Sequence, residues 1–244
     1  MYKATLLLLI GLSISIHSCS RKHPVAPSIQ QRSQHMIVFL NKSGRTDALC
    51  AGTAIGPHAI LTAEHCNGGD DPDDAVEFDL STRHYHLLSE ALDGRDHVIY
   101  LLDGPAFTNY LDESELVGTK PPQPGEKVFI YGDGLGAYPP RLVRGSVDNA
   151  SNSADLSDVD AGAHAVWYTL AAKHGDSGSA IYAEDGRVLG LLTYGFDAED
   201  RESPSKRVVG FALAFSPKVI HIAHTFSIDD VEKTLGLPPL PEIA

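Results

Sequence analysis

The sequence predicts an all-β fold: two antiparallel β-barrels of six strands each, followed by a short C-terminal helix. From residue 35 onward, short apolar runs rich in β-branched and aromatic residues are separated about every ten residues by Gly, Pro, Asn or Asp, which is typical of antiparallel strands and turns. The segment 118–125 holds three prolines, and proline removes a backbone donor and fixes φ. This segment therefore cannot be a central strand or a helix, and we expect it to connect the two barrels.

The apolar runs divide the chain into consecutive parts. We expect an N-terminal barrel over residues 35–117, a connector over 118–126, a C-terminal barrel over 127–216, and a helix and tail over 217–244. Each barrel would lie near the lower end of domain sizes. Nine of the expected strands coincide with apolar runs, at 36–40, 48–55, 59–63, 98–102, 127–132, 166–170, 179–183, 187–196 and 207–215.

A helix signal lies near the C-terminus. Ser227, three residues before Asp230, is suited to cap a short helix that reaches Leu235, after which the sequence PPLP ends it.

Charge and composition exclude some classes of partner. The chain of 244 residues has a formal net charge of −13 and 43% hydrophobic residues. Binding to nucleic acid needs clustered Lys and Arg to displace counterions from phosphates, so we expect no nucleic-acid partner. The hydrophobic content is that of an ordinary packed domain.

The N-terminus has the pattern of an export signal. Residues 1–3 carry one positive charge, residues 4–16 form an apolar run, and small residues follow at 18–20. As a helix this run would span about 20 Å, less than the roughly 30 Å of a bilayer core. We predict a signal over residues 1–19 that is cleaved on export, with an uncleaved anchor as the alternative.

Residues 16–19, Ile-His-Ser-Cys, also resemble a bacterial lipobox, although His17 departs from the usual second position. Cys19 is therefore a candidate for lipidation, with simple cleavage nearby as the alternative. The polar segment 20–34 lacks an apolar period and contains two prolines, so we expect a flexible tether there.

Two further cysteines, Cys50 and Cys66, lie in the body of the chain. An exported protein permits a disulfide. A bridge between these two would close a loop of about 16 residues, and chain entropy then suggests a stabilisation of about 3 kcal/mol. Two buried free thiols are the alternative.

The first candidate site surrounds His65. The sequence runs Cys-Ala-Gly-Thr-Ala-Ile-Gly over 50–56 and Ala-Ile-Leu-Thr-Ala-Glu-His-Cys over 59–66. This block resembles the histidine block of the chymotrypsin/trypsin-like serine proteases of compact, microbial type, where a strand of small residues leads to T-A-A-H-C. A glutamate replaces the second alanine. The resemblance implies that His65 is catalytic and that the cysteine after it is bridged back to Cys50.

The second candidate site is the sequence Lys-His-Gly-Asp-Ser-Gly-Ser-Ala over residues 173–180. It resembles the G-D-S-G nucleophile loop of the same family, which makes Ser177 the nucleophile. Gly175 would let the chain turn so that its own N–H and that of Ser177 form an oxyanion hole, and Gly178 would spare the serine a clash. Alone, this sequence also fits a generic tight turn.

The order of the two blocks predicts the third catalytic residue. Chymotrypsin-like enzymes run His, Asp, Ser, whereas α/β-hydrolases and subtilisins have other orders. An aspartate is therefore expected between residues 65 and 177, at the start of a buried strand. Asp96 opens an apolar run that resembles the family's D-I-A-L-L, while Asp93 in a Gly-containing turn and Asp103 after the strand are the alternatives.

The resemblance also implies a substrate-binding pocket. Trypsin-like members place an aspartate at the position of Ala171 to bind Lys or Arg. The neutral residue here predicts an uncharged, hydrophobic preference for the residue before the scissile bond. The expected pocket residues are Ala171, Ala172, His174, Thr193, Tyr194, Gly195 and Gly210.

Asp176 raises the question of activation. In zymogen-type relatives the matching aspartate pairs with a new N-terminal ammonium, but no I-V-G-G-like cleavage site stands in this chain. We expect another partner for Asp176, with Lys173 as a local candidate, and no requirement for N-terminal trimming.

Three other patterns have weaker functional interpretations. The acidic segment 69–74 lacks the full EF-hand spacing, so a solvated loop is favoured over a calcium site. His84 and His86 would share one face of a strand, but no third metal ligand accompanies them. Residues 41–43 and 149–151 fit the N-glycosylation pattern.

Taken together, these features predict a serine endopeptidase of the trypsin-like family S1 that acts on protein or peptide substrates through His65, Asp96 and Ser177. We expect a monomer without cofactor or metal, secreted or held at the cell envelope, possessing a lipid anchor if Cys19 is modified. The alternatives are an inactive protease-fold binding protein and a serine esterase on the same residues. A metal-dependent hydrolase would need an H-E-x-x-H motif, which the sequence lacks.

Overall fold

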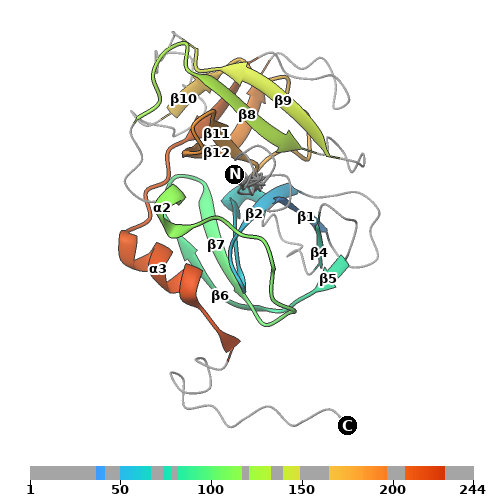
Figure 1. Cartoon of the computed structure of the whole chain (residues 1–244). Coiled ribbons are helices and arrows are strands. Elements are labelled where there is room, and N and C mark those ends of the chain that lie inside the picture. The colour runs from blue at the N-terminus through green and yellow to red at the C-terminus, as the bar shows by residue number, and fades with distance from the viewer. Residues whose placement is uncertain are drawn as a thin grey trace, which may run out of the picture.

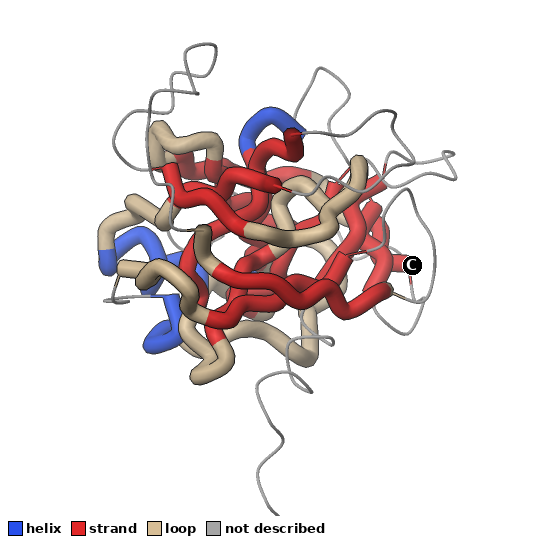
Figure 2. Tube along the Cα trace, turned by 90° about the horizontal axis from the view of Figure 1, so that it is seen from above, coloured by secondary structure: helices blue, strands red, loops and turns tan. Residues whose placement is uncertain are grey.

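The computed structural model describes residues 37–41, 50–66, 74–77, 82–116, 121–132, 140–148, 165–196 and 207–228. These residues form two β-sheets, one above the other in Figure 1. Seen from above in Figure 2, strands run through the middle of the molecule and helices lie at its edge. The expected export signal, lipidation site and tether lie outside the described residues.

The N-terminal sheet contains seven strands in the order β5-β4-β1-β2-β3-β7-β6, with every described pair antiparallel. Its two edge strands, β5 and β6, are separated in the chain only by Tyr85 and His86. Two residues span at most about 7 Å, so the two edges of the sheet must lie close together. The sheet is therefore curled, and one bent segment of chain forms both of its edges. The strands are β1 (Ile37–Asn41), β2 (Cys50–Gly56), β3 (Ala59–Ala63), β4 (Asp74–Glu77), β5 (Thr82–His84), β6 (Leu87–Leu92) and β7 (His97–Leu102).

The sequence predicts six strands in this barrel, and the count differs because the bend at Tyr85 and His86 divides one of them into β5 and β6. No apolar run marks β6 because its side chains are almost all exposed.

The C-terminal sheet has the six strands expected, in the order β10-β13-β12-β11-β8-β9. Its edges meet, because Val147 bridges Tyr168 and the N–H of Thr169 donates to the carbonyl of Ser146 at 2.9 Å. The sheet is therefore a closed barrel. Its strands are β8 (Lys127–Gly132), β9 (Arg141–Ser146), β10 (Ala165–Tyr168), β11 (Ala180–Ala183), β12 (Val188–Phe196) and β13 (Arg207–Phe211).

One hydrophobic cluster joins the two halves. It contains Ile55 and Leu61 of the N-terminal sheet together with Phe129, Tyr182 and Leu191 of the C-terminal sheet, all less than 5% exposed. Burial of such side chains stabilises by about 1.5–3 kcal/mol each. The halves are thus packed against each other, and an all-β double barrel of the chymotrypsin type is confirmed.

Among the described residues, two α-helices accompany the sheets, α2 (Glu113–Leu116) and α3 (Pro217–Thr225). The hydroxyl of Ser216 caps α3 by accepting from the N–H of Val219 at 3.4 Å, and proline at the first helical position suits the fixed φ of that residue. His224 Nδ1 lies 2.9 Å from the carbonyl of Ile55, so the C-terminal helix returns to the N-terminal sheet.

Helix α3 precedes the segment that Ser227 predicts to be helical. Ile228, the first residue after Ser227, is helical, and the rest of that segment to Leu235 lies outside the described residues. The apolar run that starts at Arg207 stays in strand conformation only to Phe211. Within the described residues, neither helix has the length and apolarity that crossing a membrane requires.

Candidate active site

Strand register brings His65 and Asp96 together. His65 lies in the 3₁₀ helix η1 (Glu64–Cys66) directly after β3, and Asp96 directly precedes β7. Because Ala63 of β3 pairs with His97 of β7, the residues that follow one strand and precede the other are neighbours. The N–H of Glu64 donates to the carbonyl of Asp96 at 3.0 Å.

The carboxylate of Asp96 holds His65 at two points. One oxygen lies 2.7 Å from Nδ1 of the ring, and the other accepts from the His65 main-chain N–H at 2.9 Å. An ionised carboxylate only accepts hydrogen bonds, so Nδ1 carries the proton and Nε2 is the basic nitrogen. The His65 side chain remains 34% exposed, so the imidazole is oriented from behind and open to solvent.

The other two candidate carboxylates bond different histidines. Asp93 lies 2.7 Å from Nδ1 of His97, and Asp103 lies 3.2 Å from Nδ1 of His86. Among the three, Asp96 is therefore the one whose carboxylate is bonded to His65.

The serine loop consists of two consecutive tight turns. The N–H of Asp176 donates to the carbonyl of Lys173 at 3.1 Å, and the N–H of Ser179 donates to the carbonyl of Asp176 at 3.0 Å. The third position of each turn is a glycine with positive φ, 89° at Gly175 and 83° at Gly178, as type II turns require. Ser177 stands at the second position of the second turn.

This loop docks onto the strands that lead to His65. The carbonyl of Ser177 accepts from the N–H of Ala51 at 2.8 Å. A Cβ on Gly178 would lie 2.2 Å from the carbonyl oxygen of Ala51 and 3.0 Å from the backbone nitrogen of Ala63. The close approach requires glycine, and it fixes the backbone of Ser177 against the segment two residues before His65.

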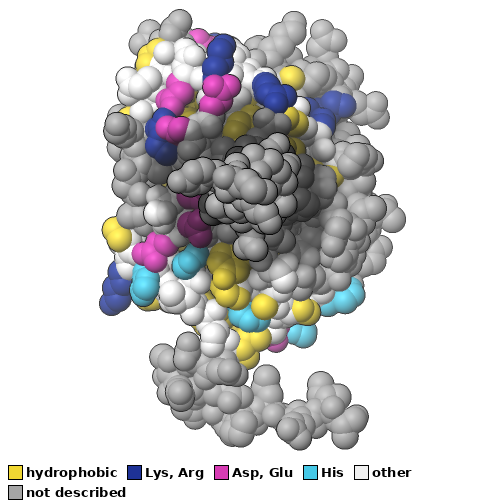
Figure 3. Space-filling model, viewed as in Figure 1, with side chains coloured by type: hydrophobic (Ala, Val, Ile, Leu, Met, Phe, Trp, Pro, Cys, Tyr) yellow, Lys and Arg dark blue, Asp and Glu magenta, His cyan; other side chains and the backbone are white. Residues whose placement is uncertain are grey.

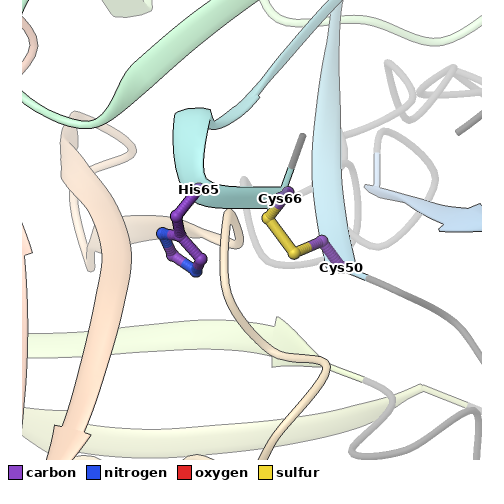
Figure 4. Close-up of side chains that lie close together, drawn as sticks. All are labelled: Cys50, His65 and Cys66. Carbon is purple, nitrogen blue, oxygen red and sulfur yellow. A yellow bond between two sulfur atoms is a disulfide. The ribbon is translucent and has the colours of Figure 1, made fainter. Parts of the chain in front are cut away.

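A disulfide joins Cys50 and Cys66, as the sequence predicts, and it braces the segments next to Ala51 and His65. Cys50 directly precedes Ala51, whose N–H bonds the Ser177 carbonyl, and Cys66 directly follows His65. Figure 4 shows the imidazole of His65 beside the bridge. The ring nitrogen and both sulfurs lie within 4.8 Å of one another, but sulfurs joined in a disulfide are not thiolates and hold no metal.

In this loop the N–H groups of His174, Gly175 and Ser177 have no acceptor among the described residues, whereas those of Asp176, Gly178 and Ser179 are bonded. Gly175 and Ser177 are the pair that the sequence predicts to hold the oxyanion. A pair of N–H groups separated by one residue in a glycine turn is suited to bind one oxyanion.

Strand β12, which carries the expected pocket residues Thr193, Tyr194 and Gly195, lies beside the serine loop, because the N–H of Gly178 donates to the carbonyl of Leu192 at 2.7 Å. The Ser177 hydroxyl donates to the carbonyl of Thr193 at 3.4 Å, which ties the serine to β12. Tyr194 pairs with Val209 and Leu192 pairs with Gly210, so β12 and β13 bring the two expected pocket strands together. Ala171, Ala172 and His174 lie in the loop immediately before the serine turns, with Ala172 buried and His174 exposed.

Arg141 is a functional candidate that the sequence did not indicate. Asp176 is 0% exposed, and its carboxylate pairs with the Arg141 guanidinium while also accepting from the main-chain N–H of Lys173 at 2.8 Å. The expected partner Lys173 thus contributes its backbone, and the compensating charge comes from β9. A second nitrogen of Arg141 donates to the carbonyl of Ala171 at 2.8 Å.

Arg141 lies 35 residues from Asp176 in the chain, and no local motif relates the two positions. Only the order of strands in the C-terminal barrel brings them together.

The histidines outside this site do not assemble into a metal site within the described part of the chain. Figure 3 shows histidine side chains spread over the lower half of that face rather than gathered. His84 and His86 are both exposed. Residues 69–73 of the acidic segment lie outside the described residues, so the calcium alternative stays a prediction.

Comparisons with known proteins identify the family of this chain. The family model described as Trypsin matches residues 26–213. No curated protein matches the chain by sequence.

Several solved structures share the fold. A serine endoprotease from Yersinia pestis has 15% identity and a TM-score of 0.58, covering 82% of this chain and 67% of its own. Rv3671c from M. tuberculosis H37Rv, in an inactive mutant form, has 16% identity and a TM-score of 0.56, with coverages of 84% and 98%. Kallikrein-related peptidase 10 has 18% identity and a TM-score of 0.55, with coverages of 74% and 91%.

Identities this low establish the fold alone, but the family match extends over most of the chain and includes both the histidine and the serine blocks. The chain therefore belongs to the trypsin family of serine endopeptidases.

Proposed function

We propose that this peptidase cleaves peptide bonds through an acyl-enzyme on Ser177, with His65 and Asp96 completing the catalytic triad. The observation that carries the proposal is the two-point bonding of His65 by Asp96, beside a serine loop docked on β2. This arrangement fixes the tautomer that leaves Nε2 basic, and it anchors the nucleophile's backbone against the same strands.

In the acylation step, the Ser177 hydroxyl turns from the Thr193 carbonyl toward Nε2 of His65 and transfers its proton there as Oγ bonds to the scissile carbonyl carbon. The carbonyl oxygen becomes an oxyanion. When the C–N bond breaks, His65 returns the proton to the leaving amine. Water then attacks the acyl-enzyme while His65 takes its proton. His65 returns that proton to the Ser177 oxygen as the acyl bond breaks, which releases the acid and restores Ser177.

The oxyanion would be held by the N–H groups of Gly175 and Ser177. Their lack of an acceptor within the described residues supports this role. Losing one such donor typically costs about 3 kcal/mol of transition-state stabilisation.

For specificity, we propose an uncharged, hydrophobic preference at the residue before the scissile bond. Ala171 offers no charge, and the nearby cation of Arg141 is already paired with Asp176 and bonded to the Ala171 carbonyl. A cationic substrate side chain would find no carboxylate at position 171 to replace its hydration.

For location, we propose export, with retention at the cell envelope if Cys19 is lipidated. The support is the charged start, apolar run and small residues of the first 20 positions. Metabolic labelling with a radioactive fatty acid tests the anchor: a label present in the wild type and lost in Cys19→Ala supports it, and no label in either refutes it.

The catalytic proposal is tested with a fluorophosphonate probe, casein and a p-nitrophenyl ester, applied to the wild type, Ser177→Ala and His65→Ala. We expect labelling and casein cleavage in the wild type only. An active Ser177→Ala variant would refute the assignment of the nucleophile. Ester hydrolysis without casein cleavage would favour an esterase, and a folded wild type inert toward all three would favour a binding protein.

A further inference from the structure

A second His–Asp pair lies directly behind the proposed triad. Asp93 and His97 flank Asp96 in the chain, and both of their side chains are 0% exposed. One carboxylate oxygen of Asp93 lies 2.7 Å from Nδ1 of His97. The proposed catalytic steps do not use either residue, so a buried ionisable pair beside the site requires another explanation.

This pair closes the turn that presents Asp96. The second carboxylate oxygen of Asp93 accepts from the N–H of Arg95 at 2.9 Å, and the N–H of Asp93 donates to the carbonyl of His97 at 3.4 Å. Within this closed turn Asp96 has φ 63°, and it is the only described non-glycine residue with positive φ. Such a conformation costs of order 1–3 kcal/mol and persists only where surrounding contacts enforce it.

The same turn is hydrogen-bonded to the segment that follows β13 of the C-terminal barrel. Asp93 Oδ2 accepts from the N–H of Ala214 at 2.9 Å, and the Arg95 guanidinium donates to the carbonyl of Ala212 at 3.2 Å. These residues follow β13, whose Phe211 ring meets the His97 ring edge-on at 6.4 Å. The turn that carries Asp96 is therefore joined to the barrel that carries Ser177.

We infer that Asp93 is a positioning residue: its buried carboxylate, bonded to His97 and Ala214, holds Asp96 in its left-handed conformation and sets its place relative to Ser177. The inference rests on the proposed function, because Asp96 must orient the imidazole for its position to affect catalysis.

The charge state of Asp93 is consistent with this role. Burial raises the pKa of the Asp93 carboxyl. The hydrogen bond and charge of His97, together with the N–H groups of Ala214 and Arg95, lower this pKa by more than burial raises it, so the pKa lies below its ordinary value. An ionised carboxylate has the acceptor capacity that three donors need.

Asp93→Asn tests the inference. An amide replaces one acceptor oxygen with a donor, so at least one of the three N–H groups loses its acceptor while side-chain volume is kept. We expect kcat to fall about 10- to 100-fold, as for a small displacement of a catalytic group, with KM changed less than about threefold. Active-site titration with the fluorophosphonate refers kcat to molecules with a competent Ser177.

Asp103→Asn is the matched control. Asp103, like Asp93, bonds Nδ1 of a histidine, that of His86 at 3.2 Å, and it also accepts from the His86 main-chain N–H at 2.7 Å, but it lies after the opposite end of β7. Its kcat should stay within about twofold of the wild type. The low-field proton resonance on His65 Nδ1, which reports the bond to Asp96, should move in Asp93→Asn and not in the control.

Two substitutions at His97 give an independent test if Asp93→Asn does not fold. His97→Asn keeps a donor where Nδ1 stands and should retain kcat within about fivefold, whereas His97→Leu removes it and should lower kcat as Asp93→Asn does. Unchanged kcat in Asp93→Asn or His97→Leu, or an equal loss in Asp103→Asn, would overturn the inference. A wild type that the fluorophosphonate does not label would instead overturn the proposed function.

Discussion

The guanidinium of Arg141 pairs with the carboxylate of Asp176, which is fully buried one residue before Ser177. In zymogen-type relatives a new N-terminal ammonium supplies this charge after cleavage. Here a side chain of β9 supplies it within the folded chain, and the same guanidinium also bonds the carbonyl of Ala171 in the expected pocket. We therefore expect the serine turns to be ordered without N-terminal trimming.

Substituting Arg141→Met should impair both folding stability and activity. It would leave the Asp176 carboxylate buried without its cation, which destabilises by roughly 3 kcal/mol, the lower end of the usual range of about 3–5 kcal/mol because Arg141 itself is 32% exposed. The fraction of molecules titrated by the fluorophosphonate should fall with it. Urea unfolding and active-site titration measure the two effects.

The double variant Arg141→Met with Asp176→Asn removes both charges and should recover part of the lost stability, because no uncompensated charge remains. Arg187→Met, which breaks the pairs with Glu126 and Asp185, is the control and should leave titration unchanged. Full activity of Arg141→Met, or an exported wild type that stays inert until it is cut, would contradict this account of activation.

Gly178→Ala should be far more damaging than Gly125→Ala. Both glycines have positive φ, 83° and 80°, so both substitutions carry about 1 kcal/mol or more of backbone strain. A Cβ at 178 would in addition meet the Ala51 carbonyl at 2.2 Å, whereas nothing lies within 4 Å of one at 125. We expect a further loss of 1–3 kcal/mol and about 10²-fold lower kcat/KM for Gly178→Ala alone. Equal effects of the two substitutions would refute the close approach.

Ala171→Asp should change the substrate preference. An added carboxylate in the proposed pocket would pair with Lys or Arg before the scissile bond and raise relative cleavage there by about tenfold or more. A peptide library digested by both proteins measures the change. Cleavage after Lys or Arg already dominating in the wild type would show that residue 171 does not form the pocket floor.

The lowered pKa of Asp93 predicts a pH-dependent contribution to stability. In the unfolded chain the Asp93 carboxyl has the ordinary pKa of about 3.9, so it binds a proton more readily in the unfolded state than in the folded state. The stabilisation is then complete above about pH 4 and declines as pH falls through the lower pKa of the folded state. Unfolding free energies of wild type and Asp93→Asn should differ most near pH 7 and converge at more acidic pH, and a gap that widens in acid would contradict the sign.

Much of the fold, and the residues proposed for the centre of the site, could be predicted from the sequence, because these predictions rest on short stretches of consecutive residues. Alternating apolar runs predict strands because side chains alternate across a pleat, and both the Cys50–Cys66 disulfide and the all-β double barrel are confirmed. The histidine and serine blocks are contiguous, so a linear pattern suffices to find them. The choice of Asp96 required strand register, and the sequence alone left Asp93 and Asp103 as alternatives.

The tertiary structure decided the contacts between distant segments. The sequence gives no sign that Arg141 would reach Asp176, that Asp93 would reach Ala214 across 121 residues, or that α3 would return to β2. These contacts depend on which strands become neighbours when two barrels close and pack, and that choice is made by burial of the whole core rather than by any local preference. The sequence thus indicates which groups we propose to carry the chemistry, and packing determines what holds them in place.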